Sequence, residues 1–189
     1  MTPAAFWFLR HGETDWNARN VAQGNLEIPL NATGIAQARA AGERLRGRGI
    51  AAIVSSPMQR ARVTAEIVGE ALALPVAFDP DLHETAYGER EGQPMSEWFT
   101  DWIAGRSTPA GAEAFADLRV RAAGAVNRAL THPPPVLVIA HGGLFRALRA
   151  EMGLEPNVRA PNGVPVLCQP PAAPGAPWVL VPAAHPEGF

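Results

Sequence analysis

The stretch AAFWFLRHG, residues 4–12, indicates the fold class of this chain. Its first six residues, Ala4–Leu9, are small, aromatic or aliphatic and do not alternate with polar ones, which is typical of a short strand buried on both faces. The run then ends at Arg10-His11-Gly12. A buried strand that stops at charged and titratable residues predicts a parallel sheet with a polar site at its carboxyl edge.

The same pattern recurs further along the chain. Val136–Ala140 is a second apolar run of strand length, followed at once by His141-Gly142-Gly143 and an expected helix over Gly142–Met152. Ala51–Ser55 is a third such run, and Ser56-Pro57 after it predicts a helix start, with a capping Ser and a Pro in the first turn. Strands that alternate with helices predict an α/β fold with a mostly parallel sheet.

Weaker patterns complete this alternation. Asn31 is a candidate N-cap for a helix with an apolar face, and a Gly/Pro break separates two later helices. The further expected elements are helices over Asn31–Arg48, Met95–Ala104 and Ala112–Leu130, and strands over Pro75–Phe78, Val164–Cys168 and Trp178–Val181. The Pro-rich stretch Pro170 to Pro177 is expected to be the turn between the last two strands.

Composition limits the kind of protein that the chain encodes. Its 189 residues are 47% hydrophobic and carry a formal net charge of −2, which suits one globular domain without the basic excess of a nucleic-acid binder. All 16 basic residues are Arg, which excludes a P-loop lysine, a Schiff-base lysine and a kinase of the usual kind. Any anion site must therefore use Arg, His or backbone N–H groups.

Two further sequence features bear on cellular compartment and redox chemistry. The single cysteine, Cys168, excludes an intramolecular disulfide and a CxxC metal or redox site. The first apolar run is too short for a signal-peptide core or a membrane span, since it stops at Arg10. We therefore expect a cytoplasmic protein with no membrane partner and no nucleic-acid partner.

Several chemically reactive side chains are expected to meet at one edge of the sheet, because ligands of parallel α/β sheets bind beyond the carboxyl ends of the strands. Arg10-His11 and His141 each follow a strand directly. Arg60 follows another strand in the first turn of its helix, and Glu84 ends the segment after Pro75–Phe78. The N-termini of two helices point at the same place and favour an anion.

These residue types suit metal-free phosphoryl transfer. Guanidinium groups match phosphate oxygens, and a neutral imidazole is a competent nucleophile toward phosphorus. A second, protonated imidazole can stabilise the equatorial oxygens of the transferring group. A carboxyl group can donate a proton to the leaving oxygen and later activate water.

Two other functions use the same residues. His11, His141 and Glu84 could be metal ligands of a hydrolase, but the neighbouring arginines argue against a cation site. The chain could also be a non-catalytic protein that binds a phosphorylated ligand. Loss of the carboxylate or of the second histidine would be typical of that function, whereas both residues are present.

The chain resembles the histidine phosphatase superfamily, also called phosphoglycerate mutase-like, over nearly its whole length. Five motifs carry the resemblance in the right order. They are Leu9-Arg10-His11-Gly12-Glu13-Thr14 with Asn17; Gln23-Gly24 with Pro29-Leu30, Gly34 and Gln37-Ala38; Ser55-Ser56-Pro57 with Arg60-Ala61 and Thr64-Ala65; Leu82-His83-Glu84 with Gly88 and Glu91-Gly92; and Ala140-His141-Gly142-Gly143. Arg90 departs from the pattern, since Trp is common at its position.

The resemblance implies a fold, a site and a substrate class. The fold is a three-layer α/β/α sandwich that forms a single domain over residues 1–189, with a cap-like helical segment at about 93–115. The expected catalytic residues are His11 as the nucleophile that becomes phosphohistidine, His141, and Glu84 as the general acid and base. The expected phosphate-binding residues are Arg10, Arg60, Asn17, Gln23, Gly24 and Gly142. No metal or cofactor is implied, and the partner is a small-molecule phosphomonoester.

The superfamily contains both phosphatases and mutases. Cofactor-dependent mutases carry a longer insert before the second histidine, an Arg where this chain has Thr85, and a Lys that this chain lacks. Arg106 is the only Arg between Arg90 and Arg119, so the insert holds few groups for a second phosphate. The sequence therefore favours hydrolysis over mutase-type transfer, and it leaves open sugar phosphates, nucleotides and alpha-ribazole phosphate as substrates.

Overall fold

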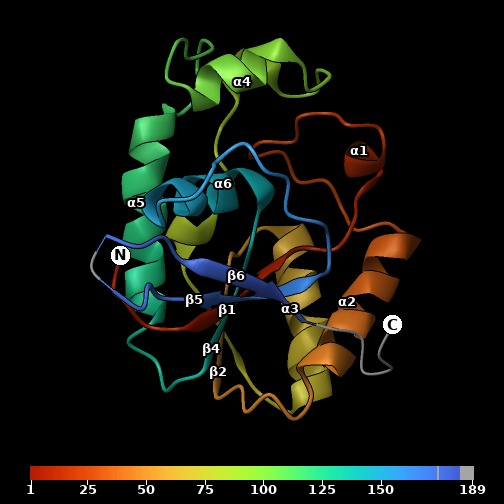
Figure 1. The fold of residues 1–189 in the computed structure, drawn as a ribbon. Helices are drawn as coiled ribbons and strands as arrows, with labels where there is room; N and C mark the ends of the chain where they lie inside the picture. Colours follow the sequence, from red (N-terminus) through yellow and green to blue (C-terminus); the bar gives the residue numbers. More distant parts are fainter. Residues whose placement is uncertain (174, 184–189) are drawn as a thin grey trace.

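The structure, a computed structural model, describes residues 1–173 and 175–183 around a six-stranded sheet (Figure 1). The strands are β1 (Phe6–Arg10), β2 (Ala52–Ser55), β3 (Val76–Phe78), β4 (Val136–Ala140), β5 (Pro165–Gln169) and β6 (Val179–Pro182). Their spatial order is β3-β2-β4-β1-β5-β6. The first four in this order run parallel, whereas β5 and β6 pair antiparallel with their neighbours. The predicted α/β fold with a mostly parallel sheet is confirmed.

Helices cover both faces of the sheet (Figure 1). They are α1 (Asp15–Ala18), α2 (Ala32–Leu45), α3 (Gln59–Leu72), α4 (Glu97–Ile103), α5 (Phe115–Ala129) and α6 (Gly142–Glu151), with 3₁₀ turns η1 (Pro80–Leu82) and η2 (Gly88–Arg90). Helices α2 and α3 pack together on one face, and α5 and α6 pack together on the other. Helix α4 lies beyond the end of the sheet, above α5 and α6 in the view of Figure 1.

Strand β1 shows why the sheet is buried on both faces. Trp7 and Leu9 belong to the apolar cluster under α2 and α3. Phe6 and Phe8 point to the opposite side and belong to the cluster under α5 and α6, where Phe8 stacks on Phe145 with ring centroids 4.1 Å apart. Side chains of a strand alternate between faces, so a run without polar residues fills both layers. This confirms the three layers expected from the sequence.

The predicted helix start at Ser56-Pro57 is wrong. Helix α3 begins at Gln59, and its N-cap, Met58, makes no side-chain capping bond. The Ser56 hydroxyl accepts a 3.3 Å hydrogen bond from the Met58 N–H and also lies 2.8 Å from Nε2 of His141. Ser56, which the sequence marks as a helix cap, therefore connects the end of β2 to His141 at the end of β4. By contrast, Asn31 caps α2 as predicted, since its Oδ1 accepts from the Gly34 N–H at 2.8 Å.

An aromatic cluster joins α4 to the rest of the domain. Trp102 is fully buried, and its ring lies 5.3 Å from the Tyr87 ring and 5.1 Å from the Phe115 ring, centroid to centroid. Its indole N–H donates to the Glu113 carbonyl oxygen at 2.8 Å. Helix α4 lies within the segment 93–115, and its role as a cap stays a prediction.

Some expectations reach residues that the structure does not describe. Residue 174, in the expected turn between the last two strands, and residues 184–189 of the expected domain lie outside the described residues. None of the helices in the described ranges is both long enough and apolar enough to cross a membrane.

Candidate active site

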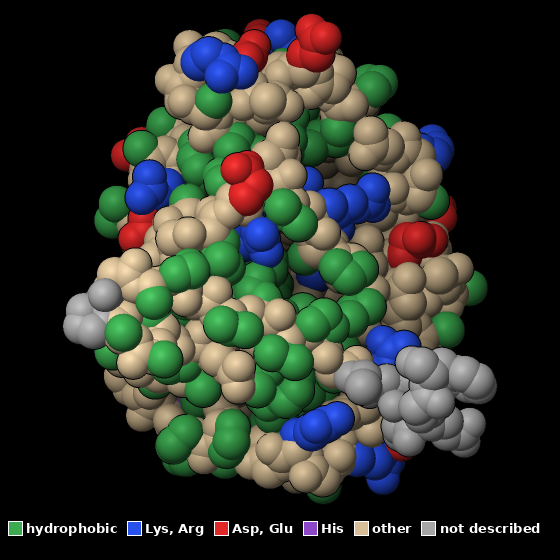
Figure 2. All heavy atoms as spheres, in the orientation of Figure 1, with side chains coloured by type: hydrophobic (Ala, Val, Ile, Leu, Met, Phe, Trp, Pro, Cys, Tyr) green, Lys and Arg blue, Asp and Glu red, His purple; other side chains and the backbone are tan. Residues whose placement is uncertain are grey.

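A pocket opens at the carboxyl edge of the parallel strands and holds about 520 Å³ of empty space, part of it open to solvent. In Figure 2, Arg side chains (blue) gather around and inside a hollow on the face shown. Eight of the nine expected site residues line the pocket: Arg10, His11, Asn17, Gln23, Gly24, Arg60, Glu84 and Gly142. The ninth, His141, packs behind His11 with ring centroids 5.3 Å apart. The structure thus brings together every residue that the sequence singled out for the site.

His11 follows β1 and has a defined tautomer. Its Nδ1 lies 2.7 Å from the carbonyl oxygen of Gly12. A carbonyl oxygen can only accept, so Nδ1 carries the proton and Nε2 of the neutral ring keeps its lone pair. Burial, and after it the charges of Arg60 and Arg10, lower the pKa of His11 well below its ordinary value. The ring is therefore neutral near pH 7 and can act as a nucleophile through Nε2.

His141 follows β4 and is also neutral in the resting pocket. Burial, and after it the charge of Arg60, lower its pKa well below the ordinary value. Its Nε2 contacts Ser56, while Nδ1 is buried without a hydrogen-bond partner among the described residues. The protonated second imidazole expected from the sequence is thus not present at rest. A dianionic phosphoryl group would favour the protonated ring by opposing the charge of the arginines.

Two buried arginines are fixed by backbone carbonyls. Arg60 donates from its two Nη atoms to the carbonyl oxygens of Gly24 and Leu26, each at 2.8 Å. Arg10 donates from Nη1 to the carbonyl oxygen of Ala160 at 2.8 Å. Burial lowers the pKa of Arg10 to about 10, so it stays a cation at neutral pH. These contacts hold the planes of both guanidinium groups and leave further N–H donors for the oxygens of an anion.

Glu84 lies against the N-terminus of α6. Its Oε2 accepts from the N–H of Gly143 at 2.9 Å, and its Oε1 accepts from the N–H groups of Leu144 and Thr85, each at 3.0 Å. The first turn of a helix has free N–H groups and attracts negative charge, which explains the position of the carboxylate. Both carboxyl oxygens of Glu84 thus accept hydrogen bonds from backbone N–H groups, which fix the orientation of the side chain in the pocket.

The two glycines after His141 make room for the site. A Cβ at Gly143 would stand 2.7 Å from Oε1 of Glu84 and 2.7 Å from the hydroxyl of Tyr87. A Cβ at Gly142 would stand 3.1 Å from the Arg10 guanidinium. The His-Gly-Gly sequence thus lets an arginine and a carboxylate approach the backbone of α6 closely.

Asn17 and Gln23 present amide groups to the pocket. Thr14 caps the short helix α1: its N–H donates to Oδ1 of Asn17 at 3.2 Å, and its hydroxyl lies 2.9 Å from Oε1 of Gln23. Asn162 also donates to Oδ1 of Asn17, at 3.2 Å. Because these contacts occupy the amide oxygens, the NH₂ groups of Asn17 and Gln23 are the ends left to donate to a ligand.

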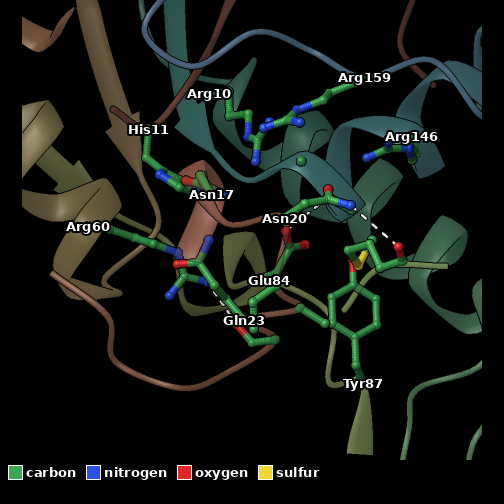
Figure 3. Close-up of a pocket in the computed structure, with 16 residues that line it drawn as sticks. Arg10, His11, Asn17, Asn20, Gln23, Arg60, Glu84, Tyr87, Arg146 and Arg159 are labelled. Atoms are coloured by element: carbon green, nitrogen blue, oxygen red, sulfur yellow. Dashed lines mark hydrogen bonds between the residues drawn. The ribbon is translucent and has the colours of Figure 1, made fainter. Parts of the chain in front are cut away.

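Four polar lining residues were not found from the sequence: Asn20, Tyr87, Arg146 and Arg159 (Figure 3). A signal existed for Arg146, because it lies four residues after Gly142 and so shares one face of α6 with it. Arg159 belongs to the irregular segment between α6 and β5, where no periodicity could reveal it. We call Arg10, His11, Arg60, Glu84 and His141 the floor, since all five are buried. We call the half-buried Met95 and Arg146 and the exposed Asn20 and Arg159 the rim.

The pocket has the composition of an anion site. Among the residues that the structure describes, no three His, Cys, Asp or Glu side chains gather in a way that could hold a metal ion. Arg90, which departs from the family pattern, does not line the pocket and lies over the Trp98 ring, 6.0 Å from its centroid.

Comparison with known proteins gives consistent results. The family model of the histidine phosphatase superfamily (branch 1) matches residues 6–161. A relative in Bacillus subtilis (strain 168), named uncharacterized phosphatase PhoE, is 40% identical over 160 residues, which cover 82% of this chain and 81% of that protein. A probable phosphoglycerate mutase, GpmB of Yersinia enterocolitica, is 34% identical over 164 residues, which cover 80% of this chain and 76% of the relative.

A solved structure extends the likeness to the fold. The mycobacterial glucosyl-3-phosphoglycerate phosphatase in complex with VO3 is 30% identical, with a TM-score of 0.77, and the match covers 93% of this chain and 96% of that one. The parallel sheet with its two histidines, the family match over residues 6–161 and these relatives agree. The chain belongs to the histidine phosphatase superfamily, whose phosphatase and phosphoglycerate mutase-like members are its relatives.

Proposed function

We propose that this chain is a metal-independent phosphomonoester hydrolase that works through a phosphohistidine at His11. The observation that carries the proposal is the tautomer of His11. Its Nδ1–H donates to the Gly12 carbonyl oxygen, so Nε2 offers a lone pair in a pocket that also holds two buried arginines and Glu84. A neutral imidazole held in this way is prepared to attack phosphorus.

The first step transfers the phosphoryl group to the enzyme. Nε2 of His11 forms the bond to phosphorus while the ester P–O bond breaks, and protonated Glu84 gives its proton to the leaving oxygen. The product alcohol departs neutral, and Glu84 is left as a carboxylate. Arg10 and Arg60 bind the phosphoryl oxygens, together with the donors of Asn17, Gln23, Gly24 and Gly142. Positioning and charge neutralisation supply most of the catalysis in such transfers.

The second step returns the enzyme to its starting state. The Glu84 carboxylate takes a proton from water, and the resulting hydroxide oxygen bonds to phosphorus as the N–P bond to His11 breaks. Inorganic phosphate leaves, and Glu84 holds the proton needed for the next cycle. The N-terminus of α6 supports the carboxylate form that this step requires, through the N–H groups of Gly143 and Leu144.

A second candidate is mutase-type transfer, in which an alcohol replaces water as the acceptor. The relatives named probable phosphoglycerate mutase favour it. Hydrolysis is favoured by Thr85, whose position holds an Arg in cofactor-dependent mutases, and by the absence of lysine. A mutase assay with 3-phosphoglycerate, run with and without 2,3-bisphosphoglycerate, separates the two candidates by their product.

The decisive experiment compares His11→Ala with wild type on a panel of phosphomonoesters that includes p-nitrophenyl phosphate. We expect kcat to fall by at least about 10⁴-fold, because the covalent route is lost. Wild type quenched during turnover should yield an acid-labile phosphoprotein, and the variant should not. A chelator such as EDTA should leave the wild-type rate unchanged, whereas a metallohydrolase would lose it.

His132→Ala is the matched control. It also removes an imidazole, but His132 is exposed on the surface. Its rate should equal that of wild type. A His11→Ala variant with a normal rate would refute the proposed mechanism. A wild-type protein that turns over no phosphomonoester, yet binds one, would instead support a non-catalytic phosphate-binding protein.

The proposal extends to the size of the substrate and the cellular location of the activity. The substrate is a small phosphorylated molecule, since arginines line a pocket with about 520 Å³ of empty space. We propose a cytoplasmic location for this activity. Fractionation of the native host with an antibody against the chain tests this location.

A further inference from the structure

Glu91 connects two segments of the pocket, although no step of the proposed mechanism uses it. It is half-buried and is not among the residues that line the pocket. Its Oε1 accepts a hydrogen bond from the N–H of Asn25 and another from the N–H of Tyr87, each at 3.1 Å. Asn25 directly follows Gly24, and Tyr87 lies three residues after Glu84. One carboxylate oxygen therefore joins the phosphate-binding loop to the segment that carries Glu84.

The contact with Asn25 reaches Arg60 through a single peptide group. The N–H of Asn25 and the carbonyl group of Gly24 belong to the same planar unit and point in opposite directions. The N–H donates to Glu91, and the carbonyl oxygen accepts from Nη2 of Arg60 at 2.8 Å. The next carbonyl oxygen, that of Leu26, accepts from Nη1 of Arg60, also at 2.8 Å. The carboxylate thus holds the peptide group that orients one end of the guanidinium.

The backbone at Gly24 leaves room for this carboxylate. Gly24 has a φ of +51°, in the left-handed region that favours glycine, and a Cβ there would collide with Oε1 of Glu91. On the other side, Tyr87 is buried in the aromatic cluster, with its ring 5.3 Å from that of Trp102, centroid to centroid. Its N–H is therefore a rigid anchor for the carboxylate.

The charge of Glu91 also acts on Arg60. Burial lowers the pKa of Arg60, whereas the charges of Glu84, Glu27 and, less strongly, Glu91 oppose this shift. A negative charge at Glu91 therefore favours the cationic guanidinium that an anionic ligand needs.

The two segments do not depend on this side chain to pack together. The N–H of Gly92 donates to the carbonyl oxygen of Ala22 at 2.8 Å, and the N–H of Ala22 donates to that of Gln93 at 2.9 Å. These backbone contacts remain when the side chain of Glu91 is removed. Its removal should therefore release the Gly24–Asn25 peptide group rather than unfold the domain.

We propose that Glu91 is a positioning residue that acts through the Gly24–Asn25 peptide group to aim the Arg60 guanidinium at the phosphoryl oxygens. This inference rests on the proposed function and deepens it, because Arg60 binds the phosphoryl group of that reaction. Glu91 itself contacts neither the phosphoryl group nor the reacting atoms. Its contribution to phosphate binding should therefore disappear when Arg60 is absent.

A double-mutant cycle tests this dependence, with inorganic phosphate as the ligand in calorimetry. Glu91→Ala should weaken phosphate binding by about tenfold, since a displaced guanidinium loses part of a charged hydrogen bond. Arg60→Met should weaken it by about 100-fold, since the whole guanidinium is lost. Adding Glu91→Ala to Arg60→Met should cost less than about twofold more, because the group through which Glu91 acts is gone. Values of kcat/KM for p-nitrophenyl phosphate should follow the same pattern.

Two further variants separate the hydrogen bonds of Glu91 from its mere presence. Glu91→Gln keeps an oxygen that accepts from both N–H groups, so phosphate binding should stay within about threefold of wild type. Glu89→Ala is the control, because it removes a carboxylate from the same segment, where Glu89 is exposed and lies 3.8 Å from Arg90. Its phosphate binding and its rate should equal those of wild type.

The outcomes distinguish positioning from a general structural role. An equal loss from Glu91→Ala with and without Arg60, or wild-type phosphate binding in Glu91→Ala, would overturn the positioning role while hydrolysis stands. If thermal unfolding shows that Arg60→Met does not fold, Arg60→Lys takes its place in the cycle with the same expectation. Calorimetry needs no turnover, so coupling of Glu91 to Arg60 without hydrolysis of any ester would instead overturn the hydrolase and leave the positioning role in place.

Discussion

The floor and the rim of the pocket hold their polar groups in different ways. Each floor side chain is buried and is bound by backbone atoms or by a neighbouring side chain, as Arg60 is by the carbonyl groups of Gly24 and Leu26. Of the rim arginines, Arg146 is half-buried and Arg159 is exposed in an irregular segment, and neither forms an ion pair with the described acidic residues. The floor is thus fixed by the fold, whereas the rim depends on individual side chains.

This difference separates chemistry from selectivity. Backbone N–H and C=O groups are kept in every substitution except one by proline, so the geometry of phosphoryl transfer persists as long as the sheet and α6 form. Rim side chains can change without disturbing those contacts. Damage to the floor should therefore slow the reaction of every phosphomonoester, whereas damage to the rim should change the preference among them.

After His11→Ala, the largest effect should come from Glu84→Gln, which keeps the shape of the side chain and removes its acid and base functions. We expect kcat to fall by about 10²–10⁴-fold, the usual contribution of general acid–base catalysis. Phosphohistidine should accumulate with p-nitrophenyl phosphate, because this leaving group needs no proton but the attacking water still needs a base. Rapid-quench measurement of the burst of p-nitrophenol detects the accumulation.

Leaving-group dependence is the control for Glu84→Gln. The loss in the first step should be larger for alkyl phosphates than for p-nitrophenyl phosphate, since only poor leaving groups need the proton. An equal loss with both classes and no burst would show that Glu84 is not the acid and base. Arg159→Gln at the rim should show no such dependence on leaving-group acidity.

Most of the floor could be predicted from the sequence because strand ends carry strong signals. The apolar runs before Arg10-His11 and His141 identify buried parallel strands, and parallel strands align their carboxyl ends. The contacts of Ser56 could not be predicted in this way. Ser before Pro favours a helix cap locally, but Nε2 of His141, which is 85 positions away, lies within hydrogen-bond distance.

The rim was mostly missed, for a physical reason. In the insert between Glu84 and His141, where the resemblance places anion-binding arginines, Arg106 pairs instead with Asp101 at the surface. The arginines that line the pocket come from α6 and from the segment before β5. Tertiary packing places Arg159 there, and no local propensity reports such packing.

The next largest loss of kcat is expected from a single methyl group added at the floor. In Gly143→Ala the new Cβ meets Oε1 of Glu84 and the hydroxyl of Tyr87, so the carboxylate must move from the N–H groups of α6. We expect kcat to fall by roughly 10–100-fold with little loss of stability, since small displacements of catalytic groups are costly. Steady-state kinetics and thermal unfolding of the same preparation measure the two effects.

Gly124→Ala provides the comparison for the extra methyl group. Gly124 lies in α5, and a Cβ there meets only the Arg128 side chain at 3.8 Å. This variant should keep the wild-type rate and gain slight stability from helix propensity. A Gly143→Ala enzyme with wild-type kcat would mean that Glu84 tolerates displacement, contrary to a rigid floor.

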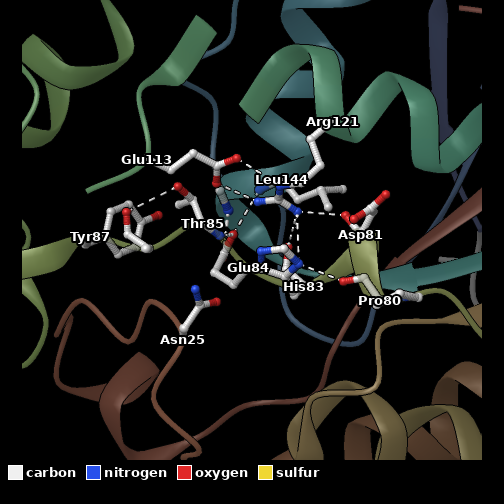
Figure 4. A network of polar contacts seen from close by, with 12 residues as sticks. Asn25, Pro80, Asp81, His83, Glu84, Thr85, Tyr87, Glu113, Arg121 and Leu144 are labelled. Carbon is white, nitrogen blue, oxygen red and sulfur yellow. Dashed lines mark hydrogen bonds and ion pairs between the residues drawn. The ribbon is translucent and has the colours of Figure 1, made fainter. Parts of the chain in front are cut away.

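A smaller effect is expected from Arg121, which positions Glu84 from outside the pocket (Figure 4). Its Nη1 donates to the carbonyl oxygens of Asp81 and His83 at 2.7 and 2.9 Å, and its Nε and Nη2 donate to Glu113 at 2.8 and 2.6 Å. Arg121→Met should lower kcat by about tenfold and destabilise the fold by roughly 1–3 kcal/mol, because these acceptors lose a charged donor. Kinetics and denaturant unfolding test both values.

A purely structural role of Arg121 would lower stability without changing the pH profile of kcat. A positioning role should alter that profile, because Glu84 would lose its fixed place beside α6. Arg119→Met, two residues away in the same helix, is the control: it breaks the more exposed pair with Glu151. This control should leave both kcat and the profile as in wild type.

The smallest effect concerns stability at mildly acidic pH, where the floor and the rim differ because only the floor holds histidines. The folded-state pKa of His11 lies well below the unfolded value because of burial and then Arg60 and Arg10. The unfolded chain therefore binds more protons below pH 7, so the free energy of unfolding falls as pH falls through the unfolded pKa near 6.5. The expected loss is roughly 0.7 kcal/mol per histidine between pH 7 and 6.

His11→Gln should remove this share of the pH dependence, and Arg159→Gln should remove none, because Arg stays charged throughout this range. Urea unfolding of wild type and both variants at the two pH values measures the difference, and an unchanged dependence in His11→Gln would mean that His11 is not held neutral by the fold.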